Sequence, residues 1–340
     1  KVLLHDHLDG GLRPSTVIEL ADAVGHALPS TDATKLEKWF FCGGDDVGDL
    51  PKYLEKFSHT FGVMQTPDAL HRVASEAAQD LAADGVVYAE VRFGPSLHTS
   101  GGMVLDEIIE TVVAGLAEGS KGTLLKVGVL AVALRNQSDS VEIAEAALRH
   151  RDRGVVGFDI AGPEDGYPPE LHLAAFHLLQ RESFHFTIHA GEAFGPRSIW
   201  KALQWCGAER LGHGYRIIDD IDMSGDSPTV GPLAAYVRDR RIPLEICPTS
   251  NVHIGAVESV AQHPIGLLYE LGFRVTVNTD NRLMSRVTTT SEMLALVRDH
   301  AWDWSNLHRV TVNAAKSAFL PFEQRVELIE NIINPAYEGL

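Results

Sequence analysis

Eight short apolar runs recur along the 340-residue chain, and each is followed by a longer segment with polar and apolar residues at helical spacing. The runs span residues 2–7, 86–93, 125–134, 155–160, 186–190, 210–213, 242–247 and 274–279. They are almost continuously hydrophobic, which is typical of parallel strands covered on both faces. No Gly/Ser-rich linker or change in composition divides the repeats. The pattern predicts an α/β protein with a closed TIM (β/α)8 barrel, as a single domain over residues 1–340.

The segment between the first two predicted strands is abnormally long. It far exceeds the roughly 30 residues of a simple βαβ unit, so we expect extra helices there, at about residues 15–85 and above the barrel mouth. One apolar stripe at helical spacing lies within it, made of Leu50, Tyr53, Leu54, Phe57 and Phe61. The stripe either packs against the barrel or forms a hydrophobic lid over a flat ligand.

The charge balance limits the class of partner. The chain has 46 Asp and Glu against 29 Lys and Arg, a formal net charge of −17. Nucleic acids and anionic membrane surfaces require clustered basic residues, so a small neutral or cationic molecule is the expected partner. No apolar run approaches the length of a membrane span.

The cysteines indicate the compartment. Cys42, Cys206 and Cys247 are odd in number, widely spaced and without a Cys-x-x-Cys pair, so neither a disulfide framework nor a thiolate zinc site is expected. A reducing, cytoplasmic location is the default. Protein partners, oligomeric state and a removed leader before Lys1 are left open by the sequence.

Polar side chains gather where four of the predicted strands end. These ends read His-Asp-His at 5–7, His-Ala-Gly-Glu at 189–192, Gly-His-Gly at 212–214 and Asn-Thr-Asp-Asn at 278–281. His5 and His7 alternate on one strand and therefore project from the same face. Because active sites of such barrels are built at the carboxyl ends of the strands, we expect these groups to converge at the barrel mouth.

Three imidazoles and one carboxylate around a pocket suit a zinc ion. Zinc accepts nitrogen and oxygen ligands, and a catalytic zinc keeps one position for water, which it activates as a nucleophile near neutral pH. The predicted strand at 155–160 has no lysine that could be carboxylated to bridge two metals, so one ion per chain is expected. The chemistry favoured is hydrolysis or hydrolytic deamination.

Seven motifs, in order along the chain, resemble those of the adenosine deaminase family. They are His-x-His-Leu-Asp-Gly at 5–10, Tyr-Ala-Glu-Val-Arg-Phe at 88–93, Asp-Ile-Ala-Gly-Pro-Glu at 159–164, His-Ala-Gly-Glu at 189–192, Gly-His-Gly at 212–214, Cys-Pro-Thr-Ser-Asn at 247–251 and Asn-Thr-Asp at 278–280. Each motif is weak alone, whereas seven in this order are highly specific. The resemblance implies zinc-dependent deamination of adenosine and 2′-deoxyadenosine to inosine-type products and ammonia, in purine salvage.

The resemblance also implies a ligand set. His5, His7, His189 and Asp280 would hold the zinc ion, and Asp280 would keep the attacking oxygen in line. His213 would lie beside the metal and orient or deprotonate the water without completing the coordination.

By the same resemblance, Glu192 would be the general acid that protonates purine N1. A glutamate beside an apolar purine pocket should have its pKa raised by desolvation, which suits an acid at working pH. The alternative is that Glu192 caps the helix expected to start near Pro196.

Further residues are implied to contact the nucleoside. Gly162 would donate its backbone N–H to purine N3, and Asp9 would accept from the ribose 5′-hydroxyl, although Asp9-Gly10 also reads as a turn. The remaining expected substrate contacts are His7, Leu50, Tyr53, Leu54 and Phe57.

The chain departs from the family pattern at one position. Many members carry a second aspartate after the last metal ligand, thought to donate to purine N7, whereas this chain has Asn281 followed by Arg282. An asparagine NH2 group is an intrinsic donor, so N7 recognition could persist through Asn281. Arg282 and its loop could instead serve a modified nucleoside.

Three functions therefore compete. The first is an adenosine deaminase, and the second a deaminase of another 6-aminopurine, either adenine or a 5′-modified nucleoside such as aminofutalosine. The third is a catalytically silent barrel that binds nucleosides, whose hallmark would be a missing ligand or acid, and none is missing.

Overall fold

The computed structural model describes residues 1–43 and 50–340, without the side chains of residues 50–54. Eight parallel strands form its centre, each within two residues of the bounds expected from the sequence. They are β1 (Val2–His7), β2 (Tyr88–Phe93), β3 (Lys126–Leu134), β4 (Val155–Ala161), β5 (Thr187–Ala190), β6 (Arg210–His213), β9 (Pro243–Ile246) and β10 (Arg274–Val277).

The strands close into a barrel. Hydrogen bonds order them as β1-β2-β3-β4 and as β10-β9-β6-β5. Two isolated parallel bridges join these halves, Phe158 with Phe186 and Asp6 with Asp280. The expected (β/α)8 barrel is confirmed.

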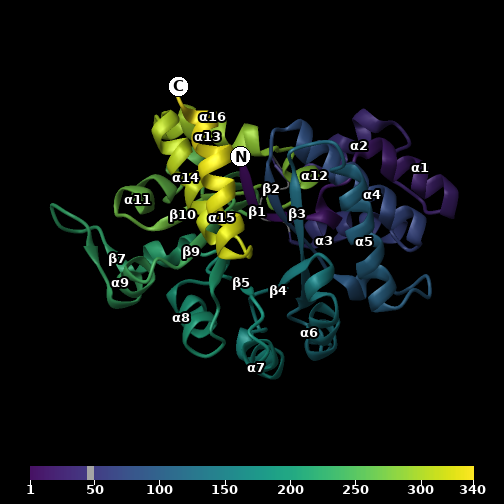
Figure 1. The fold of residues 1–340 in the computed structure, drawn as a ribbon, viewed down its shortest axis with the longest axis horizontal. Coiled ribbons are helices and arrows are strands. Elements are labelled where there is room, and N and C mark those ends of the chain that lie inside the picture. The colour runs from purple at the N-terminus through teal and green to yellow at the C-terminus, as the bar shows by residue number, and fades with distance from the viewer. Residues whose placement is uncertain (44–49) are drawn as a thin grey trace.

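Helices surround the strands (Figure 1). Those that follow the strands in turn are α5 (Leu105–Gly119), α6 (Ser140–Arg149), α7 (Leu173–Arg181), α8 (Pro196–Gln204), α9 (Pro232–Asp239), α11 (Ile265–Glu270), α13 (Thr289–His300) and α14 (Trp304–Ser317). Two short helices, α10 (Pro248–His253) and α12 (Arg282–Ser285), come directly after β9 and the β10 loop. The chain ends with α15 (Phe322–Glu327), a π-helical turn at Leu328–Ile333 and α16 (Asn334–Tyr337), while the hairpin of β7 (Ile221–Asp222) and β8 (Thr229–Val230) lies at the left edge of Figure 1.

The described part of the segment between β1 and β2 contains four α-helices, as expected. They are α1 (Pro14–Val24), α2 (Ala33–Phe40), α3 (Leu50–Val63) and α4 (Pro67–Ala83), and they occupy the right side of Figure 1. The N-terminus of α4 is capped by Thr66, whose side chain accepts from the Ala69 amide, and Pro67 takes the first turn. Its apolar stripe is buried throughout, so packing adds to the helix propensity of its alanines; the stripe is made of Leu70, Val73, Ala74, Ala77, Ala78 and Leu81.

The stripe on α3 is described only in part. The side chains of Leu50, Tyr53 and Leu54 lie outside the described residues. Phe57 is half-buried, packs against the main hydrophobic core and lies 5.5 Å from Phe61 between ring centroids. Among the described residues, no helix is long and apolar enough to cross a membrane.

Candidate active site

Four side chains expected at the barrel mouth converge on one point. His5, His7, His189 and Asp280 each offer one ligand atom, and these atoms all lie within 4.8 Å of one another. His7 Nε2 is 3.3 Å from His189 Nε2 and 3.4 Å from Asp280 Oδ1. Three of the four residues are buried and His7 is half-buried. Donor type, spacing and shielding all fit one divalent metal ion.

The backbone assembles this cluster by closing the barrel. The amide of His7 donates to the Asp280 carbonyl at 2.8 Å, and the amide of Asp280 donates to the His5 carbonyl at 3.0 Å. Asp280 and His213 both have left-handed backbones, with φ of 59° and 60°. That conformation is strained for residues with a side chain and persists where the surroundings hold the side chain in one orientation.

Buried carboxylates hold two of the histidines from behind. Glu245 Oε2 lies 3.0 Å from His5 Nδ1, and Asp159 Oδ2 lies 2.9 Å from His189 Nδ1. Arg92 donates to both acids, at 2.7 Å and 2.6 Å respectively. A carboxylate on the far nitrogen fixes the ring and leaves the near nitrogen for the metal. The second layer of the site is therefore an ion network inside the barrel.

The electrostatics of the cluster suit a cation. Burial lowers the pKa of His7 and of His189, so these imidazoles keep a lone pair for a metal. Burial opposes ionisation of Asp280, yet the adjoining imidazoles hold its pKa well below the usual range. His5 differs, because the neighbouring carboxylates raise its pKa against the effect of burial. The Nε2 atom of His5 is buried, lies 3.5 Å from Asp280 Oδ1 and has no hydrogen-bond partner among the described residues. A cation at the centre of the cluster would give this nitrogen a partner.

His213 is oriented by a chain of hydrogen bonds that starts outside the site. The Ile265 amide donates to His263 Nδ1 at 3.1 Å, which leaves the proton of neutral His263 on Nε2. That nitrogen lies 3.1 Å from Asn251 Oδ1, and Asn251 Nδ2 lies 3.2 Å from His213 Nδ1. Because Asn251 donates to Nδ1, neutral His213 carries its proton on Nε2, which lies 3.4 Å from Glu192 Oε1. Burial lowers the pKa of His213 well below its usual range, which favours this neutral form.

Glu192 is positioned by its loop. The carboxylate of Glu164 accepts from the amides of Gly191, Ala193 and Phe194, at 2.9, 2.8 and 2.8 Å. The Tyr215 hydroxyl donates to the Glu192 carbonyl at 2.9 Å. The side chain of Glu192 is therefore left to face the cluster.

Two observations bear on the role of Glu192. Burial raises its pKa well above the usual range, and the charges of Asp280 and Glu164 raise it further. The cap of α8 is Gly195, so Glu192 is not the capping residue of that helix. A carboxyl group that keeps its proton beside a metal cluster can act as a general acid.

Three of the residues expected to contact a nucleoside come shortly after the carboxyl ends of β1, β4 and β10. Asp9 is buried, with Oδ1 3.8 Å from His7 Nδ1. Gly162 follows β4 with φ of +98°, a conformation that a residue with a side chain rarely adopts. Asn281 is buried against Gly10, where an added Cβ would come within 1.9 Å of the amide oxygen of Asn281.

Arg282 is already engaged. Its Nε donates to Asp6 Oδ1 at 2.8 Å, and only about a tenth of its side chain is exposed. Its Nη2 is buried and has no hydrogen-bond partner among the described residues, so a role of Arg282 toward a modified nucleoside stays a prediction.

Sequence reasoning missed the supporting residues. Asp159 and Glu164 lie in one of the seven motifs and Asn251 in another, but the motifs alone assign no role to these residues. Glu245 lies inside a predicted strand, where a buried acid among apolar residues was the available signal. His263 carries no local signal at all.

A closed parallel barrel with a histidine and aspartate cluster at the carboxyl ends of its strands defines an amidohydrolase-type enzyme. Solved structures agree on the fold. Adenine deaminase from Arthrobacter aurescens aligns with a TM-score of 0.85 at 24% identity, over 98% of each chain. The N6-methyl-AMP deaminase of Arabidopsis thaliana aligns with a TM-score of 0.83 at 25% identity, over 99% of this chain and 96% of that one. A Burkholderia amidohydrolase with bound zinc aligns with a TM-score of 0.86 at 22% identity, over 99% of this chain and 90% of that one.

Sequence comparison defines the family. The adenosine deaminase family model matches residues 1–335. The chain is 57% identical to adenosine deaminase 1 of Streptomyces coelicolor, over all of this chain and 87% of that protein. It is 56% identical to the adenosine deaminase of Mycobacteroides abscessus, over all of this chain and 96% of that protein. The chain belongs to the adenosine deaminase family.

Proposed function

We propose that this enzyme deaminates adenosine and 2′-deoxyadenosine hydrolytically, with one zinc ion per chain held by His5, His7, His189 and Asp280. The observation that carries the proposal is that two clusters of side chains lie together at the mouth of the barrel. The four candidate ligands share a point, and Glu192 and His213 form a second group with Asp280 whose ligand atoms also lie within 4.8 Å of one another. Relatives at 55–57% identity named adenosine deaminase support adenosine as the substrate.

The donor set supports zinc over a harder cation. Three imidazole nitrogens and one carboxylate oxygen match zinc, whereas Mg²⁺ and Ca²⁺ prefer oxygen ligands. A bound zinc ion would lower the pKa of a coordinated water and so supply the nucleophile near neutral pH.

Glu192 supplies the proton that makes the purine reactive. Its carboxyl group, with a raised pKa, donates to N1 and draws electron density from C6, where the amino group departs. The loop contacts of Glu164 and Tyr215 keep this group aimed at the substrate.

His213 acts as a hydrogen-bond donor. With Nδ1 occupied by Asn251, its Nε2–H faces the reaction centre and holds the attacking water. Asp280 Oδ2, which accepts from Ser250 Oγ at 2.5 Å, leaves Oδ1 toward the histidines of the cluster. These two side chains keep the nucleophile in line with C6.

The nucleoside would be recognised at both ends. Asp9 would accept from the ribose 5′-hydroxyl, the Gly162 amide would donate to N3 and the Asn281 amide to N7. His7 and the α3 residues Leu50, Tyr53, Leu54 and Phe57 would cover the base.

The proposal is tested by an ultraviolet assay of adenosine, 2′-deoxyadenosine, adenine, aminofutalosine and 5′-deoxyadenosine on one enzyme preparation. Adenosine should have the highest kcat/KM. 5′-Deoxyadenosine should be slower by about ten-fold or more, because an unpaired buried acceptor costs about 1 to 3 kcal/mol. Faster turnover of adenine or aminofutalosine would assign the chain to the second candidate function.

A further inference from the structure

The end of the barrel opposite the active site contains a separate cavity of about 500 Å³. It is lined at the amino ends of three strands, by Arg210 of β6, Pro243 of β9 and Arg274 of β10. The candidate metal ligands lie at the carboxyl ends of strands, so this cavity is no part of the catalytic mouth.

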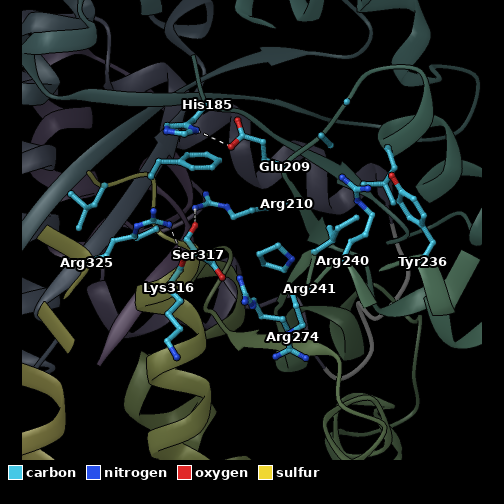
Figure 2. A pocket seen from close by; sticks show the side chains of 18 residues that line it. His185, Glu209, Arg210, Tyr236, Arg240, Arg241, Arg274, Lys316, Ser317 and Arg325 are labelled. Carbon is cyan, nitrogen blue, oxygen red and sulfur yellow. Dashed lines mark hydrogen bonds and ion pairs between the residues drawn. The ribbon is translucent and has the colours of Figure 1, made fainter. Parts of the chain in front are cut away.

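The cavity wall is strongly basic (Figure 2). Five cationic side chains line it besides Arg210, namely Arg240, Arg241, Arg274, Lys316 and Arg325. Within residues 1–43 and 50–340, none of these five side chains forms an ion pair, because no carboxylate oxygen lies within 4.0 Å of its charged nitrogen atoms. Among the described lining residues, the one acid is Glu209, and it already pairs with His185 at 2.8 Å.

Arg210 differs from the other cations. It is buried and donates to Glu245 and Glu90, at 2.6 Å and 2.5 Å. Its charge is therefore compensated inside the barrel, and the surplus positive charge belongs to the other five.

Some of these arginines are held by backbone carbonyls, and some have N–H groups that make no hydrogen bond among the described residues. Arg325 donates through Nη1 to the Lys316 carbonyl at 2.9 Å, and Arg241 through Nη1 to the Gly272 carbonyl. The Nε atoms of Arg274 and Arg325 are buried and have no hydrogen-bond partner among the described residues. Burial lowers the pKa of Arg274, and the positive charges of the nearby Arg241 and Arg325 lower it further. Buried donors without partners and uncompensated charge cost free energy that an anion would recover.

The chemistry of the wall selects the ligand. Guanidinium groups bind phosphate oxygens through paired donors. The five positive charges of the wall exceed the two negative charges that a single phosphate carries, so a ligand with more than one phosphate would balance them better. The volume falls within the range of small-molecule sites. The net charge of −17 repels extended polyanions at long range, so a recessed basic cavity admits small anions in preference to nucleic acids.

We propose that this cavity is a second ligand site, which binds a small molecule carrying two or more phosphate groups. The site is independent of the reaction proposed at the barrel mouth. The sequence indicated no polyanionic partner because the basic residues are scattered along the chain and meet only in the fold.

Isothermal titration of the metal-loaded enzyme with inorganic pyrophosphate tests the site. At about 50 mM salt, we expect one site per chain with a dissociation constant below about 1 mM, and binding of inorganic phosphate weaker by about ten-fold or more. The Arg274→Gln/Arg325→Gln variant should weaken pyrophosphate binding by about ten-fold or more and leave adenosine turnover unchanged. Salt should weaken the binding steeply.

Two further variants make the result decisive. Arg153→Gln removes an exposed arginine paired with Glu110, before β4 and outside the cavity, and should leave binding unchanged. If the Arg274→Gln/Arg325→Gln variant does not fold, a second double variant, Arg240→Gln/Lys316→Gln, is used, because both of its sites are exposed. We expect it to lose the same amount of pyrophosphate binding. Absence of pyrophosphate binding would overturn the proposal. Binding that the cavity variants retain would also overturn it, because pyrophosphate bound by the metal at the barrel mouth would give that result.

Discussion

At the scale of single residues, Glu192 owes its orientation to its loop. Glu164 fixes the backbone amides on both sides of it, so replacing the acid itself should leave the loop intact. Glu192→Gln should therefore keep the fold, the metal and nucleoside binding, but lower kcat by about 10² to 10⁴, the usual contribution of a positioned acid. Steady-state kinetics with metal analysis measure this, and near-normal kcat would contradict the role.

His213 presents a different test at the same scale, because it lies beside the cluster without belonging to the four proposed ligands. His213→Ala should retain one metal per chain while kcat falls by about 10² or more, since the Nε2 donor is lost. Elemental analysis decides the matter. A variant that loses its metal would show that His213 is a ligand.

The candidate metal ligands at the strand ends could be predicted from the sequence, whereas the residues that orient these ligands and His213 could not. His5, His7, His189 and Asp280 each follow a recognisable strand, and barrel geometry alone predicts that such ends meet. Asn251 and His263 act on His213 through contacts between elements that no local pattern encodes. The same holds for Glu245 behind His5, because an ion network inside the barrel runs against the usual apolar filling.

At the scale of elements, the eight strands were predictable because short, mostly apolar runs recur before segments with helical spacing, and α4 because its buried stripe is regular. The position of α3 relative to the mouth was not, since an apolar stripe looks the same whether it packs on a core or on a ligand. Phe57 shows the difficulty, because it is half-buried and packs against the main core.

The lid hypothesis can be tested with two phenylalanines one turn apart on α3. Phe57→Ala should raise KM by roughly three- to ten-fold with a smaller effect on kcat, as expected when about 0.7 to 1.4 kcal/mol of apolar contact with the ligand is lost. Phe61→Ala is the matched control, because Phe61 packs on Phe57 and edge-on to His98. It should lower the free energy of unfolding by about 1 to 3 kcal/mol and leave KM unchanged. Equal loss of stability in both variants with constant KM would show that the stripe only packs.

At the scale of the whole molecule, one buried acid should make stability depend on pH. Glu292 of α13 is buried, its Oε2 accepts from the Thr249 amide at 3.3 Å, and burial raises its pKa to about 8. Because this pKa exceeds that of the unfolded chain, the stabilising contribution is complete below about pH 4.5 and is lost as pH rises toward 8.

Glu292→Gln should remove this loss. The variant should therefore gain stability relative to the parent as pH rises from 5 to 8.5, by at most about 4 kcal/mol. Urea unfolding at several pH values measures the difference, and the exposed Glu323→Gln should show none. A difference that stays constant with pH would contradict the buried ionisation.

The central claim is that one metal ion at the His5, His7, His189 and Asp280 cluster supports deamination of adenosine. Its most direct test is to strip the enzyme with a chelator and restore zinc in small steps, following adenosine turnover at each step. Turnover should rise in proportion to zinc and level off at one equivalent per chain. Full activity in the stripped enzyme, or a plateau only at two equivalents, would contradict the account.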